Sequence, residues 1–114
     1  MPHIIIEHSR TGTTAEELAA LCKSMYDAFA AHDQIPRPET LKIRTVVADH
    51  HYFASGHSSY AHATVWLLAG RDTTAKTQLA ELACTVMHEC LPNVDHFSTD
   101  CQDLSAGYSK LIRE

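Results

Sequence analysis

The sequence predicts an α/β (α+β) fold in which two β-α-β units form a four-stranded mixed sheet with two helices on one face. The first observation is an internal repeat: residues 10–25 (RTGTTAEELAALCKSM) and 71–87 (RDTTAKTQLAELACTVM) share an Arg, Thr-Thr-Ala, Leu-Ala and Cys-x-x-Met in the same order. The second is that each copy follows a strand-like apolar run and has the periodicity of a helix with one apolar face. Since such a helix covers one face of a sheet, the two units can share a single sheet.

The length and composition predict one domain, residues 1–114, with pseudo-repeats of about 1–48 and 58–103. A chain of 114 residues with 45% hydrophobic residues can build its own core. The matching positions of the two copies are 60 to 62 residues apart, so only one-residue shifts separate them. We therefore expect duplicated units within one domain rather than two domains.

The first helix is expected to begin near Thr14, because Thr14-x-x-Glu17 has the spacing of a capping box. It should end at residues 31–34, before Pro36. The second helix is expected to begin near Thr74 and to end before Pro92. Apolar residues recur at helical spacing in both segments: Leu18, Leu21, Cys22, Met25 and Phe29 in the first, and Leu79, Leu82, Val86 and Cys90 in the second.

Four segments are predicted as strands, namely Ile4–Ile6, Leu41–Ala48, Tyr60–Leu68 and, from a weaker pattern, Asp95–Asp103. Asp49–Gly56 is predicted to be a short excursion or hairpin. Two helices on one face leave the other face of the sheet uncovered, and the natural cover is another subunit. A closed oligomer is therefore expected.

Charge and cysteine usage exclude several functional classes. A formal net charge of −5 argues against a general binder of nucleic acid or membrane surfaces, and no apolar run approaches the ~20 residues of a membrane span. The N-terminus lacks the basic leader of a signal peptide. The four cysteines form no CxxC pair and are interpreted as reduced packing residues. These features predict a cytoplasmic protein.

Pro2 is the most informative single residue. Met followed by a small residue is normally processed, which would leave proline as the N-terminus with a secondary amine. A free α-amino group titrates near ~8, and burial beside cations would lower its pKa further. Such an amine suits the movement of a proton between carbon and oxygen. The alternative is that Pro2 only starts a strand, where its missing N–H is harmless.

Three arginines could supply the anion-binding part of such a site. Arg10 and Arg71 occupy equivalent places in the two copies, after a strand and before a helix, and Arg44 lies within a strand. Guanidinium groups bind carboxylates in bidentate fashion, and the nearby helix N-termini add a positive field. Salt bridges to Glu7, Asp49 or Asp72 are the alternative.

The N-terminal run Pro2-His3-Ile4-Ile5-Ile6-Glu7 resembles the start of the 5-carboxymethyl-2-hydroxymuconate isomerase family, in the tautomerase superfamily. Further segments are similar as well: Ile43-Arg44, Ala54-Ser55-Gly56, Tyr60-Ala61, Ala69-Gly70-Arg71, Gln102-Asp103-Leu104 and Tyr108-Ser109-Lys110. The resemblance runs along most of the chain.

This resemblance implies a tautomerase-like fold, a homotrimer and an isomerase of the breakdown of 4-hydroxyphenylacetate, an aromatic compound. Pro2 would be the proton shuttle, Arg44 the first candidate for holding a substrate carboxylate, and Arg71 the second. The substrate would be a small anionic dienol such as 5-carboxymethyl-2-hydroxymuconate. No metal or organic cofactor is implied, and neither a nucleic-acid nor a membrane partner is expected.

Two other functions remain open at this level. One is a non-catalytic trimeric ligand-binding module that keeps the fold without using the amine; a pocket that fails to unite Pro2 with Arg44 would favour it. The other is a broader tautomerase of 2-hydroxydienoates or arylpyruvates. The nine histidines suggest a metal site, but they form no H-x3-H pair on a helix and none pairs with a cysteine at zinc-site spacing. Scattered surface and interface histidines explain them better.

Overall fold

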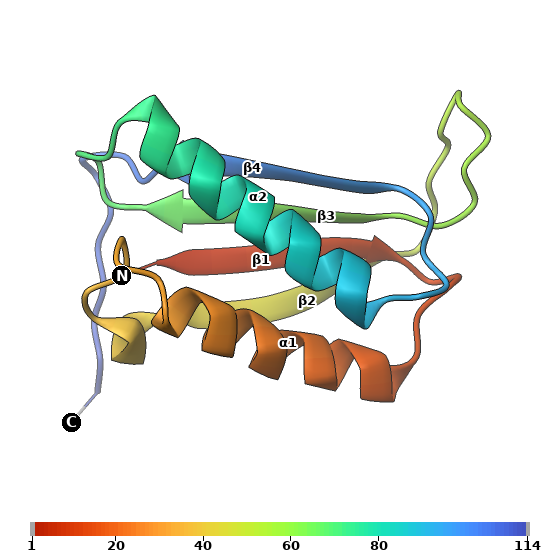
Figure 1. The fold of residues 1–114 in the computed structure, drawn as a ribbon, viewed down its shortest axis with the longest axis horizontal. Helices are drawn as coiled ribbons and strands as arrows, with labels where there is room; N and C mark the ends of the chain where they lie inside the picture. The colour runs from red at the N-terminus through yellow and green to blue at the C-terminus, as the bar shows by residue number, and fades with distance from the viewer. Residues whose placement is uncertain (1, 114) are drawn as a thin grey trace.

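The computed structural model describes residues 2–113 and confirms the predicted fold class. The elements follow the order β-α-β-β-α-β (Figure 1). They are β1 (His3–Ser9), α1 (Ala15–Ala30), β2 (Lys42–Ala48), β3 (Ala61–Leu67), α2 (Thr73–Cys90) and β4 (Phe97–Asp103), with a short 3-10 helix η1 (Pro38–Thr40) before β2. Residues 49–60 form a loop without a strand, so the segment Asp49–Gly56 is the short excursion and not the hairpin, the two forms that the sequence left open.

The four strands form one mixed sheet in the order β2-β1-β3-β4. Strands β1 and β2 run parallel, as do β3 and β4, while the central pair β1 and β3 is antiparallel. In this central pair His3 lies opposite Trp66 and His8 lies opposite Ala61. The start of β1 therefore lies beside the end of β3, and this arrangement positions the site described below.

Both helices begin at side-chain caps. The Thr14 side chain accepts a hydrogen bond from the Glu17 amide, and the Glu17 side chain accepts one from the Thr14 amide, which confirms the predicted capping box. The second helix begins at Thr73, slightly earlier than predicted, because Asp72 caps it by accepting from the Ala75 amide. Within residues 2–113, neither helix combines the length and the apolar character that crossing a membrane requires.

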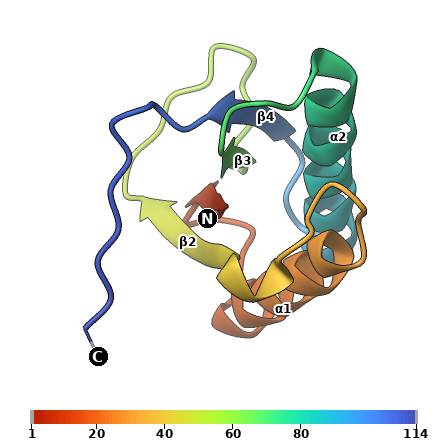
Figure 2. The same cartoon turned by 90° about the vertical axis from the view of Figure 1, so that its left-hand side faces the viewer.

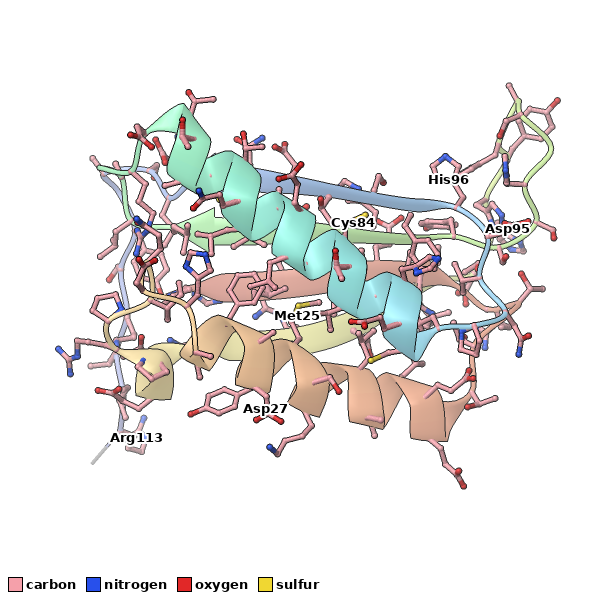
Figure 3. The ribbon with its side chains drawn as sticks, in the orientation of Figure 1. Met25, Asp27, Cys84, Asp95, His96 and Arg113 are labelled. Carbon is pink, nitrogen blue, oxygen red and sulfur yellow. The ribbon has the colours of Figure 1, made fainter. Side chains whose placement is uncertain are left out.

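The core lies between the sheet and the helices. Figure 2 shows both helices on the same side of the sheet, and Figure 3 shows Met25 on the inner side of α1 and Asp27 on its outer side. Alternate residues of the central strands face this core, including Ile4, Ile6 and Val65, which are fully buried. The polar segment 97–103 forms strand β4 at the edge of the sheet, where Phe97 and Cys101 are the hydrophobic residues that pack against the core. Edge position explains why its hydrophobic pattern is weak.

The other face of the sheet carries no helix. Its residues alternate with the core residues and include His3, Ile5, Arg44 and Trp66. The segment after β4 turns onto this side and crosses toward β2 (Figure 2). It is tied there by a hydrogen bond of 2.9 Å between His3 Nε2 and the Tyr108 hydroxyl. Trp66 is half-buried on this open face and therefore is not a core residue of the single chain.

Candidate active site

A pocket of about 260 Å³ lies at the end of the sheet where the central strand β1 begins and the central strand β3 ends. Figure 1 shows that the start of β1, the end of β3, η1 and the start of α2 lie together at this end of the sheet. The pocket has the size of a small organic acid rather than that of a nucleotide or a drug-sized ligand. Its walls are formed by Pro2, Ile35, Pro36, Arg37, Thr40, Leu67, Leu68, Arg71 and Lys110.

Pro2 is buried and held at the start of β1. Its carbonyl oxygen accepts a hydrogen bond of 3.0 Å from the backbone amide of Lys42, which extends the β1–β2 pairing by one residue. Ile35 and Leu67, both almost fully buried, line the same pocket. The amine depends on the removal of Met1, a residue outside the described range. Once free, an amine here would sit among apolar side chains and cations, and both disfavour its protonated form.

Arg71 is the only one of the three arginines singled out in the sequence that lines this pocket within the described chain. It is half-buried, and its guanidinium donates to the carbonyl oxygens of Gln34 at 2.6 Å and Leu68 at 3.3 Å. These bonds fix the side chain between the end of α1 and the end of β3. Its Nε is also buried and has no hydrogen-bond partner among the described residues. The guanidinium is thus oriented by the backbone and is not neutralised by any ion pair recorded for the described residues.

Arg44 lies elsewhere, on the open face of the sheet. It lines a shallow hollow together with His3, Ile5, Trp66 and Tyr108, and its guanidinium donates to His3 Nδ1 at 3.2 Å. Because a guanidinium can only donate, His3 must accept at Nδ1, which leaves its Nε2–H to donate to Tyr108. Burial and the positive charges of Arg44 and Lys42 lower the pKa of His3. Within one chain, the Pro2 pocket therefore does not include Arg44.

Arg10 lies at the far end of β1 from Pro2. Its guanidinium is paired with the carboxylate of Asp49, and the two side chains are 68% and 71% exposed. It lines a third hollow with His8, Thr13 and Thr14 at the start of α1. The predicted arginines thus lie in three different places, and only Arg71 accompanies Pro2.

Two cations of the pocket, Arg37 and Lys110, were not identified from the sequence. Arg37 stands between Pro36 and Pro38, and this Pro-Arg-Pro run, which exposes an arginine on a rigid turn, was the available signal. Lys110 comes from the segment after β4, where no periodic pattern marks a functional position. Both line the pocket with Pro2 and Arg71.

The described part of the chain offers no cluster of metal-ligating side chains, and its cysteines form no disulfide. Residues 2–113 contain no group of three or more His, Cys, Asp and Glu side chains arranged to hold a metal ion. All four cysteines are free and half-buried, and burial raises the pKa of the Cys22 and Cys101 thiols. A raised pKa leaves less of the reactive thiolate, as expected for packing residues.

Solved structures share this fold. The structure of a 5-carboxymethyl-2-hydroxymuconate isomerase from Deinococcus radiodurans R1 matches with a TM-score of 0.79 and 16% identity, over 98% of this chain and 90% of that chain. A 5-carboxymethyl-2-hydroxymuconate delta-isomerase matches with a TM-score of 0.73 and 17% identity, over 99% and 89%. A fused 4-OT wild-type symmetric trimer matches with a TM-score of 0.71 and 19% identity, over 90% and 85%.

These matches, together with the paired β-α-β units, define a protein of the tautomerase-like fold class. The model of the 5-carboxymethyl-2-hydroxymuconate isomerase family matches residues 2–106. The chain therefore belongs to the 5-carboxymethyl-2-hydroxymuconate isomerase family. A search of curated protein sequences gave no match.

Proposed function

We propose that this protein is an isomerase that moves a proton between the enol oxygen and a carbon of a dienol carboxylate such as 5-carboxymethyl-2-hydroxymuconate. The observation that carries the proposal is the burial of Pro2 in the same small pocket as the guanidinium of Arg71. Membership of an isomerase family supports the same reaction class.

The reaction needs one base that also returns the proton. The free amine of Pro2 would take the proton from the enol O–H, the electrons would shift along the diene to form C=O, and the protonated amine would deliver the proton to a remote carbon. No atom is gained or lost overall. An amine with a pKa near operating pH can perform both transfers.

Arg71 would hold a substrate carboxylate and stabilise the charge that develops on the enol oxygen. Its two backbone hydrogen bonds orient the guanidinium before the substrate arrives. A pre-oriented cation costs no reorganisation during the reaction, which is what electrostatic stabilisation of a transition state requires.

Arg44 would join the site only through assembly. It lies on the open face of the sheet, where Trp66 is half-buried and Val46 is 49% exposed. We propose a homotrimer that covers this face and brings Arg44 of one copy to a neighbouring copy as a further catalytic and substrate-binding group. Light scattering should report the mass of three chains, and a monomer would remove this part of the proposal. Arg10, paired with Asp49, stays a weaker candidate for substrate binding.

The test is isomerisation of 5-carboxymethyl-2-hydroxymuconate, followed by ultraviolet absorbance, with protein shown by mass spectrometry to lack Met1. Pro2→Ala, which keeps a primary amine but loses the ring, should lower kcat/KM by roughly 100-fold or more. The absence of turnover by the Met1-free wild type would contradict the proposal.

We further propose that the protein acts in the cytoplasm, in the degradation of 4-hydroxyphenylacetate.

One alternative has an observation in its favour. Since Pro2 and Arg44 line different hollows of the single chain, the protein could be a trimeric module that binds an anionic ligand without converting it. Binding of the dienol without turnover in the same experiment would support this function. Turnover of smaller 2-hydroxydienoates or arylpyruvates at equal rates would instead support a broader tautomerase.

A further inference from the structure

Three side chains form a hydrogen-bonded chain on the open face of the sheet. Tyr108 comes from the segment after β4, His3 from β1 and Arg44 from β2. His3 Nε2 lies 2.9 Å from the Tyr108 hydroxyl, and a guanidinium nitrogen of Arg44 lies 3.2 Å from His3 Nδ1. In the parallel pairing of β1 and β2, His3 stands opposite Lys42, so its ring reaches diagonally to Arg44, two residues further along β2 and on the same face. His3 therefore links the C-terminal segment to an arginine of the neighbouring strand.

This hydrogen-bonded chain has only one polarity. A guanidinium can only donate, so His3 accepts at Nδ1 and carries its proton at Nε2, from which it donates to the Tyr108 oxygen. The rings of His3 and Tyr108 also meet edge to face, with centroids 5.6 Å apart and an interplanar angle of 72°. Tyr108 thus favours the tautomer of His3 that can accept from Arg44. The other tautomer, with the proton at Nδ1, has no acceptor to offer there.

Arg44 has few other restraints. It is exposed, and none of the ion pairs within residues 2–113 includes it. A long exposed side chain loses rotamer freedom when it binds a carboxylate, and this loss weakens binding. The hydrogen bond to His3 takes up one nitrogen and restricts the guanidinium before a ligand arrives. The other guanidinium nitrogens stay available for a carboxylate.

The surroundings of His3 keep its ring an acceptor. Burial lowers the pKa of His3, and the positive charges of Arg44 and Lys42 lower it further. At neutral pH the ring is therefore uncharged and does not repel Arg44. Lys42 donates instead to the carbonyl oxygen of Thr40 at 3.0 Å, which leaves Nδ1 of His3 to Arg44.

We propose that His3 is a positioning residue for Arg44 and is itself oriented by Tyr108. His3 acts through Arg44 and touches no reacting atom. The inference rests on the proposed function, in which Arg44 reaches a substrate carboxylate in a neighbouring copy of the trimer. It extends that function by making the C-terminal segment part of the machinery that orients the guanidinium.

Steady-state kinetics at pH 8 with Met1-free protein tests the hydrogen bonds. His3→Leu removes both ring nitrogens and should lower kcat/KM for 5-carboxymethyl-2-hydroxymuconate by roughly tenfold. His3→Gln keeps an acceptor and a donor in one side chain and should stay within about threefold of the wild type. Tyr108→Phe should lower kcat/KM by about threefold, because it removes the partner of the Nε2–H group. Equal losses in His3→Leu and His3→Gln would overturn the proposal.

A double-mutant cycle with Arg44→Gln separates positioning from a general structural role. Once Arg44 is gone, His3→Leu should have less than about a twofold further effect, because His3 acts only through Arg44. An additive loss would overturn the proposal, since it would mean that His3 supports the site in another way.

His62→Leu is the matched control. His62 is also a half-buried histidine on the open face, but its partners are Ser98 and Thr64. The effect of His62→Leu on kcat/KM should be the same with and without Arg44. Coupling to Arg44 as large as that of His3 would overturn the assignment to His3.

The tautomer of His3 gives a test in the unaltered protein, which does not depend on the folding of His3→Leu. Nitrogen NMR of protein with isotope-labelled histidine should place the His3 proton at Nε2 at pH 8. The His3 signals are assigned by their loss in His3→Gln. A proton at Nδ1 would overturn the proposal, because Arg44 would then have no acceptor.

Failure of the isomerase function is distinguishable from failure of this inference. If the Met1-free wild type shows no turnover, the same cycle is measured by calorimetry as binding of trans,trans-muconate, an unreactive dienoate. Coupling between His3 and Arg44 in binding would then support positioning, although the isomerase function fails. Additive effects on muconate binding, or no effect of Arg44→Gln, would overturn positioning. Fast turnover that Arg44→Gln leaves unchanged would also overturn it, while the isomerase function stands.

Discussion

Arg10 and Arg71 occupy matching positions in the two β-α-β units, yet their surroundings differ. Arg10 follows β1 and forms an exposed ion pair with Asp49. Arg71 follows β3, is half-buried, and donates to the carbonyl oxygens of Gln34 and Leu68. A repeated sequence has produced a repeated backbone with two different sites.

The difference arises from the strand that lies beside each arginine. The end of β3 lies beside the start of β1, where Pro2 would carry a free amine. The end of β1 lies beside the start of β3, where Ser9 and Tyr60 bond to each other and the loop after β2 leads into β3. Only the end beside Pro2 can therefore present a terminal amine, and the proton transfer that we propose takes place at that end.

The other end holds aromatic packing instead. The rings of His51, Phe53 and Tyr60 pack within about 5 Å of one another, and His96 adds a further edge contact to Phe53. Figure 3 shows His96 and Asp95 at the end of the molecule opposite to Arg113. Burial and the hydrogen bond to Glu7 raise the pKa of Tyr60 to about 12, so its hydroxyl stays protonated at neutral pH.

The largest expected effect is a difference in catalytic efficiency between variants of the two arginines. Arg71→Ala should lower kcat/KM for the dienol by roughly 10- to 100-fold, because it removes a charged, pre-oriented hydrogen-bond donor. Arg10→Ala should change it by less than about threefold, since Arg10 lies at the far end and is already paired. Steady-state kinetics of both variants, with circular dichroism to check folding, measures this. Equal losses would mean that Arg10 also reaches substrate, through another copy of the chain.

The next effect concerns stability at two glycines with positive φ, Gly12 (+82°) and Gly70 (+131°), which stand near the two arginines. Alanine strains the backbone at either position, but at Gly12 its Cβ would also lie 2.7 Å from the carbonyl oxygen of Asn93. Gly12→Ala should therefore lower the free energy of unfolding by about 2 kcal/mol or more, and Gly70→Ala by about 1 kcal/mol. Urea unfolding of both variants measures the difference, and a larger loss at Gly70 would contradict this interpretation.

The smallest effect is a pH dependence at the Pro2 end. The pKa of His3 is lowered in the folded protein, first by burial and then by Arg44 and Lys42. Above the unfolded pKa of about 6.5 His3 is neutral in both states, and its contacts contribute fully. As pH falls below that value, the unfolded chain binds the proton more readily, so stability decreases.

His3→Gln should reduce this loss of stability between pH 7.5 and pH 5, and Arg44→Gln should reduce it in part, because it removes one of the charges that lower the pKa. Urea unfolding at several pH values measures both. A wild-type stability curve that His3→Gln leaves unchanged would contradict the assignment.

The fold was accessible from the sequence because its signals are local. Thr14 and Glu17 predicted the capping box, and the spacing of Leu21, Met25 and Phe29 predicted the buried face of α1. The internal repeat predicted two β-α-β units. Strand β4 has the weakest sequence signal of the four strands. It lies at the edge of the sheet and packs against the core only through partly buried residues, so its hydrophobic pattern is weak.

The site was accessible only in part. Pro2 and Arg71 were recognisable because one follows Met1 and the other recurs in the repeat. Arg37 and Lys110 were not, because they lie 73 positions apart in the sequence and nothing local indicates that they share a pocket. The separation of Arg44 from Pro2 was also hidden, because it depends on the pairing of β1 with β2 and on the face of the sheet that Arg44 occupies.

The sequence by itself determined the helices, the central strands, the duplicated architecture and the residue types available for proton transfer and anion binding. These follow from periodicity, capping and chemistry that act over a few residues. The tertiary structure alone decided which of these groups meet. The antiparallel register of β1 and β3 places Pro2 near Arg71 and leaves Arg10 at the opposite end, because pairing between strands is set by contacts over long separations in sequence.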